Sequence, residues 1–203
     1  MHLKRAIKLI GQSDLVDLIE DRRKKYKRPE IDEILVGDLS EYPPMKLYEV
    51  ARKYFRKRVP EFEPYMINSV MDRTKYYSPK ALYLYAYNII KGPWPEAEEA
   101  LMGYDKSDYM YSIKYAKNVL RGRWPELEQR ILGENNADAA YNYAREILKG
   151  RWPEAEPVIM KDPWAAFYYI KDVIKSRWPE AEPYIKKNSY FWEKYQKEFG
   201  LED

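Results

Sequence analysis

The sequence is built around a short stretch, Gly150-Arg151-Trp152-Pro153-Glu154-Ala155-Glu156. Close or weaker copies recur at 92–98 (GPWPEAE), 122–128 (GRWPELE), 176–182 (SRWPEAE), 57–63 (KRVPEFE) and 27–33 (KRPEIDE). A motif that returns at intervals of this length is typical of a protein built from repeated structural units. We therefore align the units on the motif tryptophan, or on Val59 in its place, and count positions from that residue as zero.

The residues before each motif predict an amphipathic helix. Counting back from Trp152, the apolar positions are −12, −11, −9, −8, −5 and −4, which is a helical spacing. Position −8 is usually alanine, as in Ala144, and its small side chain would let a neighbouring helix approach closely. A basic residue follows at −3 and a glycine often at −2. We expect this glycine, for example Gly150, to form a left-handed C-cap.

The motif itself predicts the start of a second helix. Pro153 suits the first helical position, where no backbone N–H is needed. Glu154 and Glu156 then fall in the first turn, where free amides and the helix dipole favour anions. An apolar residue at +7, here Ile159, is expected to face the core.

These units predict an all-α fold. We expect a right-handed α/α solenoid of antiparallel helix pairs, with about five repeats between degenerate N- and C-terminal caps. The expected organisation is a single helical-repeat domain over 1–203, with an N-terminal cap at 1–42, the repeats at 43–187 and a C-terminal capping helix at 188–203. One unit cannot bury its aromatic stripe alone, so adjacent units must cover it.

Composition limits the possible classes of protein. Lysine plus arginine is 36 and aspartate plus glutamate is 33, and a net charge of +3 does not by itself indicate nucleic-acid binding. Residues 1–58 hold 15 basic and 10 acidic residues, so only the N-terminal part leans basic. Cysteine is absent, and neither a signal peptide nor a membrane-length apolar run is recognisable. We expect a soluble cytoplasmic protein without a membrane partner.

The motif tryptophans are interpreted as structural plugs between units, because a residue needed in every unit is needed for stacking. The motif arginine is expected to reach the first-turn glutamates of an adjacent second helix. The four tryptophans of this set are Trp94, Trp124, Trp152 and Trp178.

The chain offers little for catalysis. Glu154 and Glu156 stand two residues apart on a helix and point about 200° away from each other, so they do not face one substrate. His2 is the only histidine, and no phosphate-binding glycine motif is present. We therefore predict a non-enzymatic protein with no catalytic residue, metal, cofactor or small-molecule substrate.

Two basic clusters are candidates for a charged interaction surface, which we call the basic edge. Equivalent helix ends of a solenoid align along one edge, so the clusters could form a single phosphate-binding patch. The alternative is that they are solvated helix ends that complement helix dipoles. The residues of the basic edge are Arg22, Arg23, Lys24, Lys25, Lys27, Arg28, Arg52, Lys53, Arg56, Lys57 and Arg58.

Tyrosine is abundant, with 21 residues. Most are expected to pack in the core, since a tyrosine packs its ring while keeping a polar tip. Tyr87, Tyr111 and Tyr168 stand at less regular positions and are candidates for exposed contacts with a partner peptide or with bases. Core packing remains the alternative for these three.

The pattern Tyr-Ala-x-x-Ile-Leu-Lys-Gly-Arg-Trp-Pro-Glu-Ala-Glu at 143–156 resembles repeats in proteins of tailed bacteriophages, most of them without assigned function. The resemblance covers residues 46–187 and transfers no catalytic residue. It implies a phage protein in the host cytoplasm. We predict an interaction module that binds a host or viral protein, one case being inhibition of a host defence factor. The alternative is a nucleic-acid-binding protein that uses the basic edge, and the oligomeric state stays open.

Overall fold

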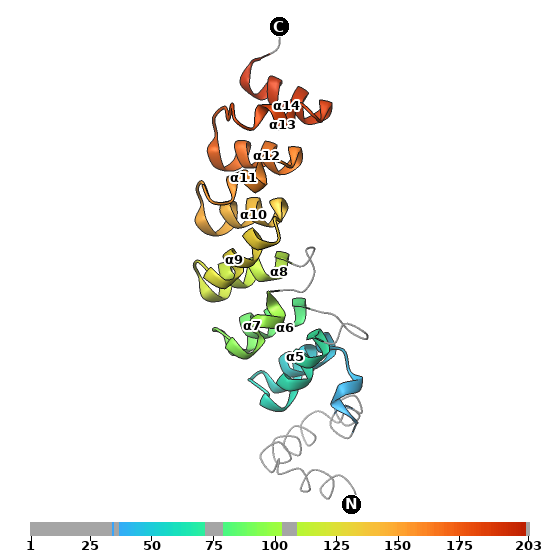
Figure 1. Ribbon diagram of the computed structural model, residues 1–203. Coiled ribbons are helices and arrows are strands. Elements are labelled where there is room, and N and C mark those ends of the chain that lie inside the picture. Colours follow the sequence, from blue (N-terminus) through green and yellow to red (C-terminus); the bar gives the residue numbers. More distant parts are fainter. Residues whose placement is uncertain (1–33, 35–36, 72–78, 103–108, 202–203) are drawn as a thin grey trace, which may run out of the picture. The chain divides into compact units, whose positions relative to one another are not determined.

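The computed structural model describes residue 34 and residues 37–71, 79–102 and 109–201 (Figure 1). Every regular element in these ranges is a helix and none is a strand, so the all-α prediction is confirmed there. Two compact units, Met1–Lys91 and Gly92–Asp203, are described separately. Most of the predicted cap at 1–42 lies outside the described residues, and the single domain over 1–203 stays a prediction.

The first unit consists of short helices packed on one another. Helix α4 contacts both α5 and α6, and α5 also contacts α6. Elements η1 and η3 are 3-10 turns, whereas η2 and η4 are π-helical turns that continue α4 and α6. The described elements are η1 (Leu39–Glu41), α4 (Pro44–Val50), η2 (Ala51–Phe55), η3 (Pro60–Phe62), α5 (Glu63–Met71), α6 (Pro79–Tyr85) and η4 (Ala86–Ile90).

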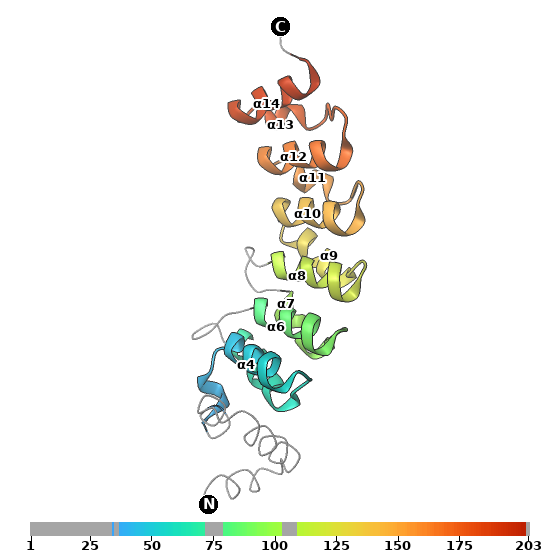
Figure 2. The ribbon, with the colours of Figure 1, turned by 180° about the vertical axis from the view of Figure 1, so that it is seen from behind.

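The second unit repeats a longer and a shorter helical segment. The longer segments begin with α8, α10, α12 and α14, which contact one another in that order, as Figure 2 shows. The described elements are α7 (Pro95–Leu101), α8 (Tyr109–Tyr115), η5 (Ala116–Leu120), α9 (Pro125–Gly133), α10 (Ala137–Tyr143), η6 (Ala144–Leu148), α11 (Glu156–Ile159), α12 (Pro163–Tyr169), η7 (Ile170–Ile174), α13 (Glu182–Ile185) and α14 (Ser189–Phe199).

The second helix of a repeat starts at the motif proline only in some copies. Helices α7 and α9 begin at Pro95 and Pro125, as predicted. Helices α11 and α13 begin three residues later, and each is a single short turn. In these copies a further proline, Pro157 or Pro183, stands at +5. Because proline has no N–H, it cannot make the helical bond to the carbonyl of the motif proline, and the regular helix starts late.

The end of the first helix differs from the prediction. Each described first helix except α14 widens into a π turn, and the residue after it is left-handed, with φ between 52° and 60°. That residue is the basic one at −3, for example Lys149, whose N–H bonds to the carbonyl of Ala144. The expected left-handed cap at Gly150 is therefore wrong, because the π turn reverses the chain one residue earlier. Among the described glycines only Gly200 has positive φ, and it ends α14.

The core is formed by aromatic and small side chains. Positions −12, −9 and −8 are buried in every described unit, as Ala140, Tyr143 and Ala144 show. The +7 residue, such as Ile159, is fully buried, which confirms that prediction. Positions −5 and −4 are only half-buried in several units, as at Ile147, so the apolar stripe is narrower than the sequence indicated.

Candidate functional site

The motif arginine binds a glutamate of its own motif. Arg151 donates from Nε and Nη2 to the two carboxylate oxygens of Glu156, both at 2.7 Å. The two residues lie five apart in the chain, so the hydrogen bonds of this arginine stay within its own motif and do not reach an adjacent second helix. The pKa of Arg151 is raised first by Glu156 and also by Glu180 of the next motif. The pair does not depend on the late start of α11, because it also forms at Arg123–Glu128, where α9 begins at the motif proline. The same pair recurs as Arg58–Glu63, Arg123–Glu128 and Arg177–Glu182.

A tyrosine of the following helix completes this arrangement. The hydroxyl of Tyr169 accepts the backbone N–H of Trp152 at 2.6 Å and donates to Glu156 at 3.0 Å. We call the set of backbone N–H, glutamate and tyrosine the tyrosine junction, with or without the arginine. It recurs at Val59–Glu63–Tyr85, Trp94–Glu98–Tyr115, Trp124–Glu128–Tyr143 and Trp178–Glu182–Tyr195.

Three junction tyrosines of the second unit, Tyr115, Tyr143 and Tyr169, also pack on the tryptophan of their own repeat. The ring of Tyr143 lies 5.2 Å from that of Trp152, and Tyr169 lies 5.6 Å from Trp178. Both tryptophans are almost completely buried. One tyrosine side chain therefore connects two consecutive motifs, with its hydroxyl on the earlier motif and its ring on the later one.

Electrostatics favours the charge states that the junction requires. Burial raises the pKa of Tyr143 far above its usual value, so its hydroxyl stays protonated and can donate. Burial alone would raise the pKa of Glu128, but hydrogen bonds from Arg123 and Tyr143 outweigh it and hold the pKa below its ordinary value. The carboxylate is thus ionised, and both of its oxygens accept hydrogen bonds.

The junction explains the paired glutamates of the motif. Glu156 is 9% exposed and bound, while Glu154 is exposed, so the two carboxylates do not converge. Sequence reasoning missed the junction itself. The available signal was that position −9 repeats as tyrosine rather than phenylalanine, which indicates that the hydroxyl is needed.

Only part of the predicted basic edge lies within the described residues. Arg22, Arg23, Lys24, Lys25, Lys27 and Arg28 lie outside the described residues. Arg52, Lys53, Arg56 and Lys57 are exposed. Glu49, Arg52, Lys53 and Arg56 line an open hollow in the first unit. Arg58 differs from them, because both of its donating nitrogens bind Glu63 in a junction.

The three candidate aromatic residues have different surroundings. Tyr87 is 48% exposed and stacks on Tyr83, with the ring centroids 5.8 Å apart. Tyr111 is half-buried, and Lys114 lies over its ring. Tyr168 is half-buried among other rings, including Trp164 at 5.1 Å. The prediction did not include Trp164 or the exposed Tyr190.

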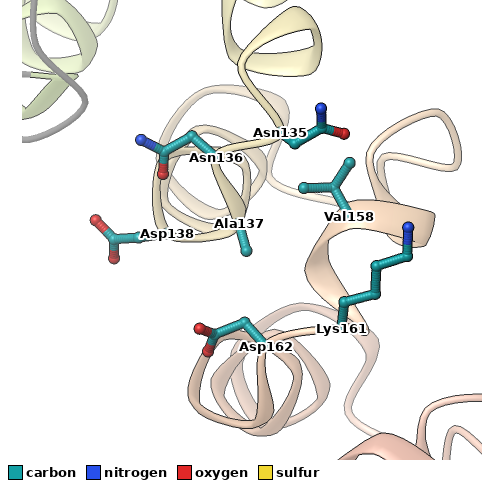
Figure 3. Close-up of a pocket in the computed structure, with 7 residues that line it drawn as sticks. All are labelled: Asn135, Asn136, Ala137, Asp138, Val158, Lys161 and Asp162. Carbon is teal, nitrogen blue, oxygen red and sulfur yellow. The ribbon is translucent and has the colours of Figure 1, made fainter.

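Figure 3 shows a second hollow, between the starts of α10 and α12. Its polar side chains include two helix caps, since Asn136 accepts the N–H of Ala139 and Asp162 accepts that of Ala165, both at 2.9 Å. Burial raises the pKa of Asp138 at the rim. The side chains of Asn136 and Asp162 in this hollow therefore serve as N-caps of α10 and α12.

Within the described ranges no three histidine, cysteine or acidic side chains are grouped to hold a metal ion. The same ranges contain no helix whose length and apolar character would let it cross a membrane. Comparisons of the chain with protein-family models, curated proteins and solved structures gave no match.

Proposed function

We propose that the protein is a non-enzymatic interaction module built as a right-handed solenoid of antiparallel helix pairs, which presents the outer surface of its first helices to another protein. The observation that carries this proposal is the tyrosine junction. In each described copy the motif glutamate at +4 and the tyrosine join consecutive repeats, and the arginine, where present, binds that glutamate. The outer positions of the first helices differ between repeats, and a surface that differs in this way suits recognition.

The bacteriophage resemblance adds the class of partner. On this proposal the protein acts in the host cytoplasm on a host or viral protein, and inhibition of a host defence factor is one such activity. The resemblance of 143–156 to phage repeats supports this part, independently of the geometry.

The test is affinity capture with the full chain from cells that produce it. Recovery of one protein in constant ratio to the bait, after nuclease treatment, is the expected result. Recovery that disappears with nuclease contradicts the proposal.

Nucleic-acid binding is the second candidate, supported by the exposed Arg52, Lys53, Arg56 and Lys57. Filter binding of DNA and RNA at low and high salt tests it, because phosphate binding weakens steeply with salt. No retention at low salt excludes this candidate. Retention at low salt that Arg52→Glu with Lys53→Glu abolishes would establish it.

A further inference from the structure

The second residue of both α12 and α14 is an exposed aromatic. Trp164 is 38% exposed and Tyr190 is 58% exposed. Two half-buried rings join them: Tyr168 packs on Trp164, and Phe191 packs on Tyr190 with centroids 5.1 Å apart. Tyr168 and Phe191 contact each other, so the aromatic surface is continuous across the two helices. No junction uses these four side chains.

Lysines extend this surface toward the other end of each helix. Trp164, Tyr168 and Lys171 are spaced as i, i+4 and i+7, which places them on one side of α12 and the start of η7. Lys175 is the left-handed residue that ends η7. Lys171 and Lys175 are exposed. Asp172 beside them is already paired, since it accepts from Tyr141 and lies 3.6 Å from Arg145.

Helix α14 repeats the pattern. Tyr190, Lys194 and Lys197 follow at i, i+4 and i+7, and Lys194 lies over the ring of Tyr190 at 4.4 Å. The acidic residues Glu193 and Glu198 fall about 60° and 80° to either side of Tyr190 around the helix. Both helices thus present an aromatic end and a lysine end. We call Trp164, Tyr168, Lys171, Lys175, Tyr190 and Lys194 the aromatic–lysine face.

We propose that the aromatic–lysine face binds an acidic segment of the partner protein that carries an aromatic or large aliphatic anchor. This inference rests on the proposed function and names the chemistry of its partner. Exposed tryptophan and tyrosine supply much of the binding energy at protein interfaces. Lysines around such a centre favour carboxylates and disfavour basic partners. The anchor contacts Trp164 and Tyr190, and its acidic neighbours face Lys171 and Lys175.

The ring geometry favours a peptide over single-stranded nucleic acid. Stacking of successive bases requires ring faces that are open to receive them. Here Trp164 and Tyr168 are inclined by 51°, Tyr168 and Phe191 by 72°, and Tyr190 and Phe191 by 76°. The edges and faces cover one another, so the cluster suits a side-chain anchor better than a stack of bases.

The experiment selects from a random peptide library displayed on yeast against the full chain. We expect the enriched peptides to place aspartate or glutamate beside an aromatic or leucine-like anchor. Tyr190→Ser should weaken a selected peptide about tenfold, and Lys175→Glu about fivefold. Matched controls are Met110→Ser, an exposed residue at the second position of α8, and Arg121→Glu, which like Lys175 is left-handed at −3. Both controls should bind normally.

Failure to enrich acidic peptides, or equal binding by all four variants, overturns the proposal. Binding of a labelled single-stranded oligonucleotide that Tyr190→Ser and Lys175→Glu abolish would also overturn it, in favour of nucleic acid. The proposed function is judged separately, by affinity capture. If Tyr190→Ser and Lys175→Glu both still capture the partner, the proposed function stands. Only the assignment of binding to the aromatic–lysine face is then disproved.

Discussion

Two junctions of the second unit differ by one residue. At 150–156 the junction includes Arg151, whereas at 92–98 the equivalent position is Pro93. The backbone bond to tyrosine is nevertheless the same, at 2.6 Å from Trp152 and 2.7 Å from Trp94. The tyrosine-to-glutamate bond is 3.0 Å in both. The tyrosine, the backbone N–H and the glutamate therefore form the junction, and the arginine covers and neutralises the carboxylate.

The largest expected effect comes from removing the tryptophan at either junction. Trp152→Ala and Trp94→Ala should each lower the free energy of unfolding by about 3–5 kcal/mol, because each leaves a cavity in a closely packed site. Urea denaturation followed by circular dichroism measures this. A loss below about 1 kcal/mol at either site would show that the ring does not support that junction.

The second largest effect is expected from removing the hydroxyl of the junction tyrosine. Tyr169→Phe and Tyr115→Phe keep the ring but leave the buried N–H of Trp152 or Trp94 without its acceptor. We expect each to cost about 1–3 kcal/mol in the free energy of unfolding. Similar losses at both sites would confirm that the hydroxyl acts without the arginine. A loss confined to Tyr169→Phe would contradict the conclusion that the two junctions work alike, because the hydroxyl would then matter only beside an arginine.

The arginine-containing junctions should also make stability depend on pH. The pKa of Glu128 and that of Glu182 are lowered in the folded state, so their contribution is complete above the unfolded value of 4.5. It is lost as pH falls below 4.5 through the folded values, because protonation then breaks the bonds to arginine. Denaturation curves between pH 6 and about pH 3 measure this loss. Glu128→Gln should reduce the loss of stability at acid pH. An unchanged loss in this variant would show that Glu128 is not its source.

The smallest effect is expected from restoring the missing arginine. Pro93→Arg should place a guanidinium near Glu98, whereas Pro93→Ala controls for the loss of the proline. We expect the arginine variant to exceed the alanine variant by about 0.5 kcal/mol in the free energy of unfolding, as for a partly exposed ion pair. The difference should vanish in 1 M salt. Equal stability at low salt would mean that the arginine adds nothing measurable.

The repeats and their buried positions could be predicted from the sequence because the spacing of apolar residues is local information. Pro157 was visible too, yet its effect on the start of α11 depends on which helical bond it removes. The turn at Lys149 was mispredicted, since glycine is the usual left-handed residue and the π turn is not evident from composition. An added Cβ at Gly122 would meet nothing within 4 Å, which explains why Ser176 and Lys57 are accommodated at the same position.

The candidate interaction residues were harder to predict. Exposure depends on what the next repeat covers, and a single repeat does not reveal this. Trp164 looks like a core residue by type, but it follows Pro163 at the start of α12 and lies outside the buried positions. Alignment of the repeats groups it with Met110 and Tyr190, which are exposed as well.

The order of the junctions along the chain gives the protein a direction of assembly. Each motif leaves the ribosome before the tyrosine that satisfies its backbone N–H, as Trp152 precedes Tyr169. A nascent repeat is therefore unfinished until the following helix has been synthesised. Removal of α14 would leave the N–H of Trp178 without its acceptor, the hydroxyl of Tyr195. Loss of a repeat from the N-terminal end leaves every later motif with its tyrosine. The array should therefore tolerate truncation better at the N-terminal end than at the C-terminal end.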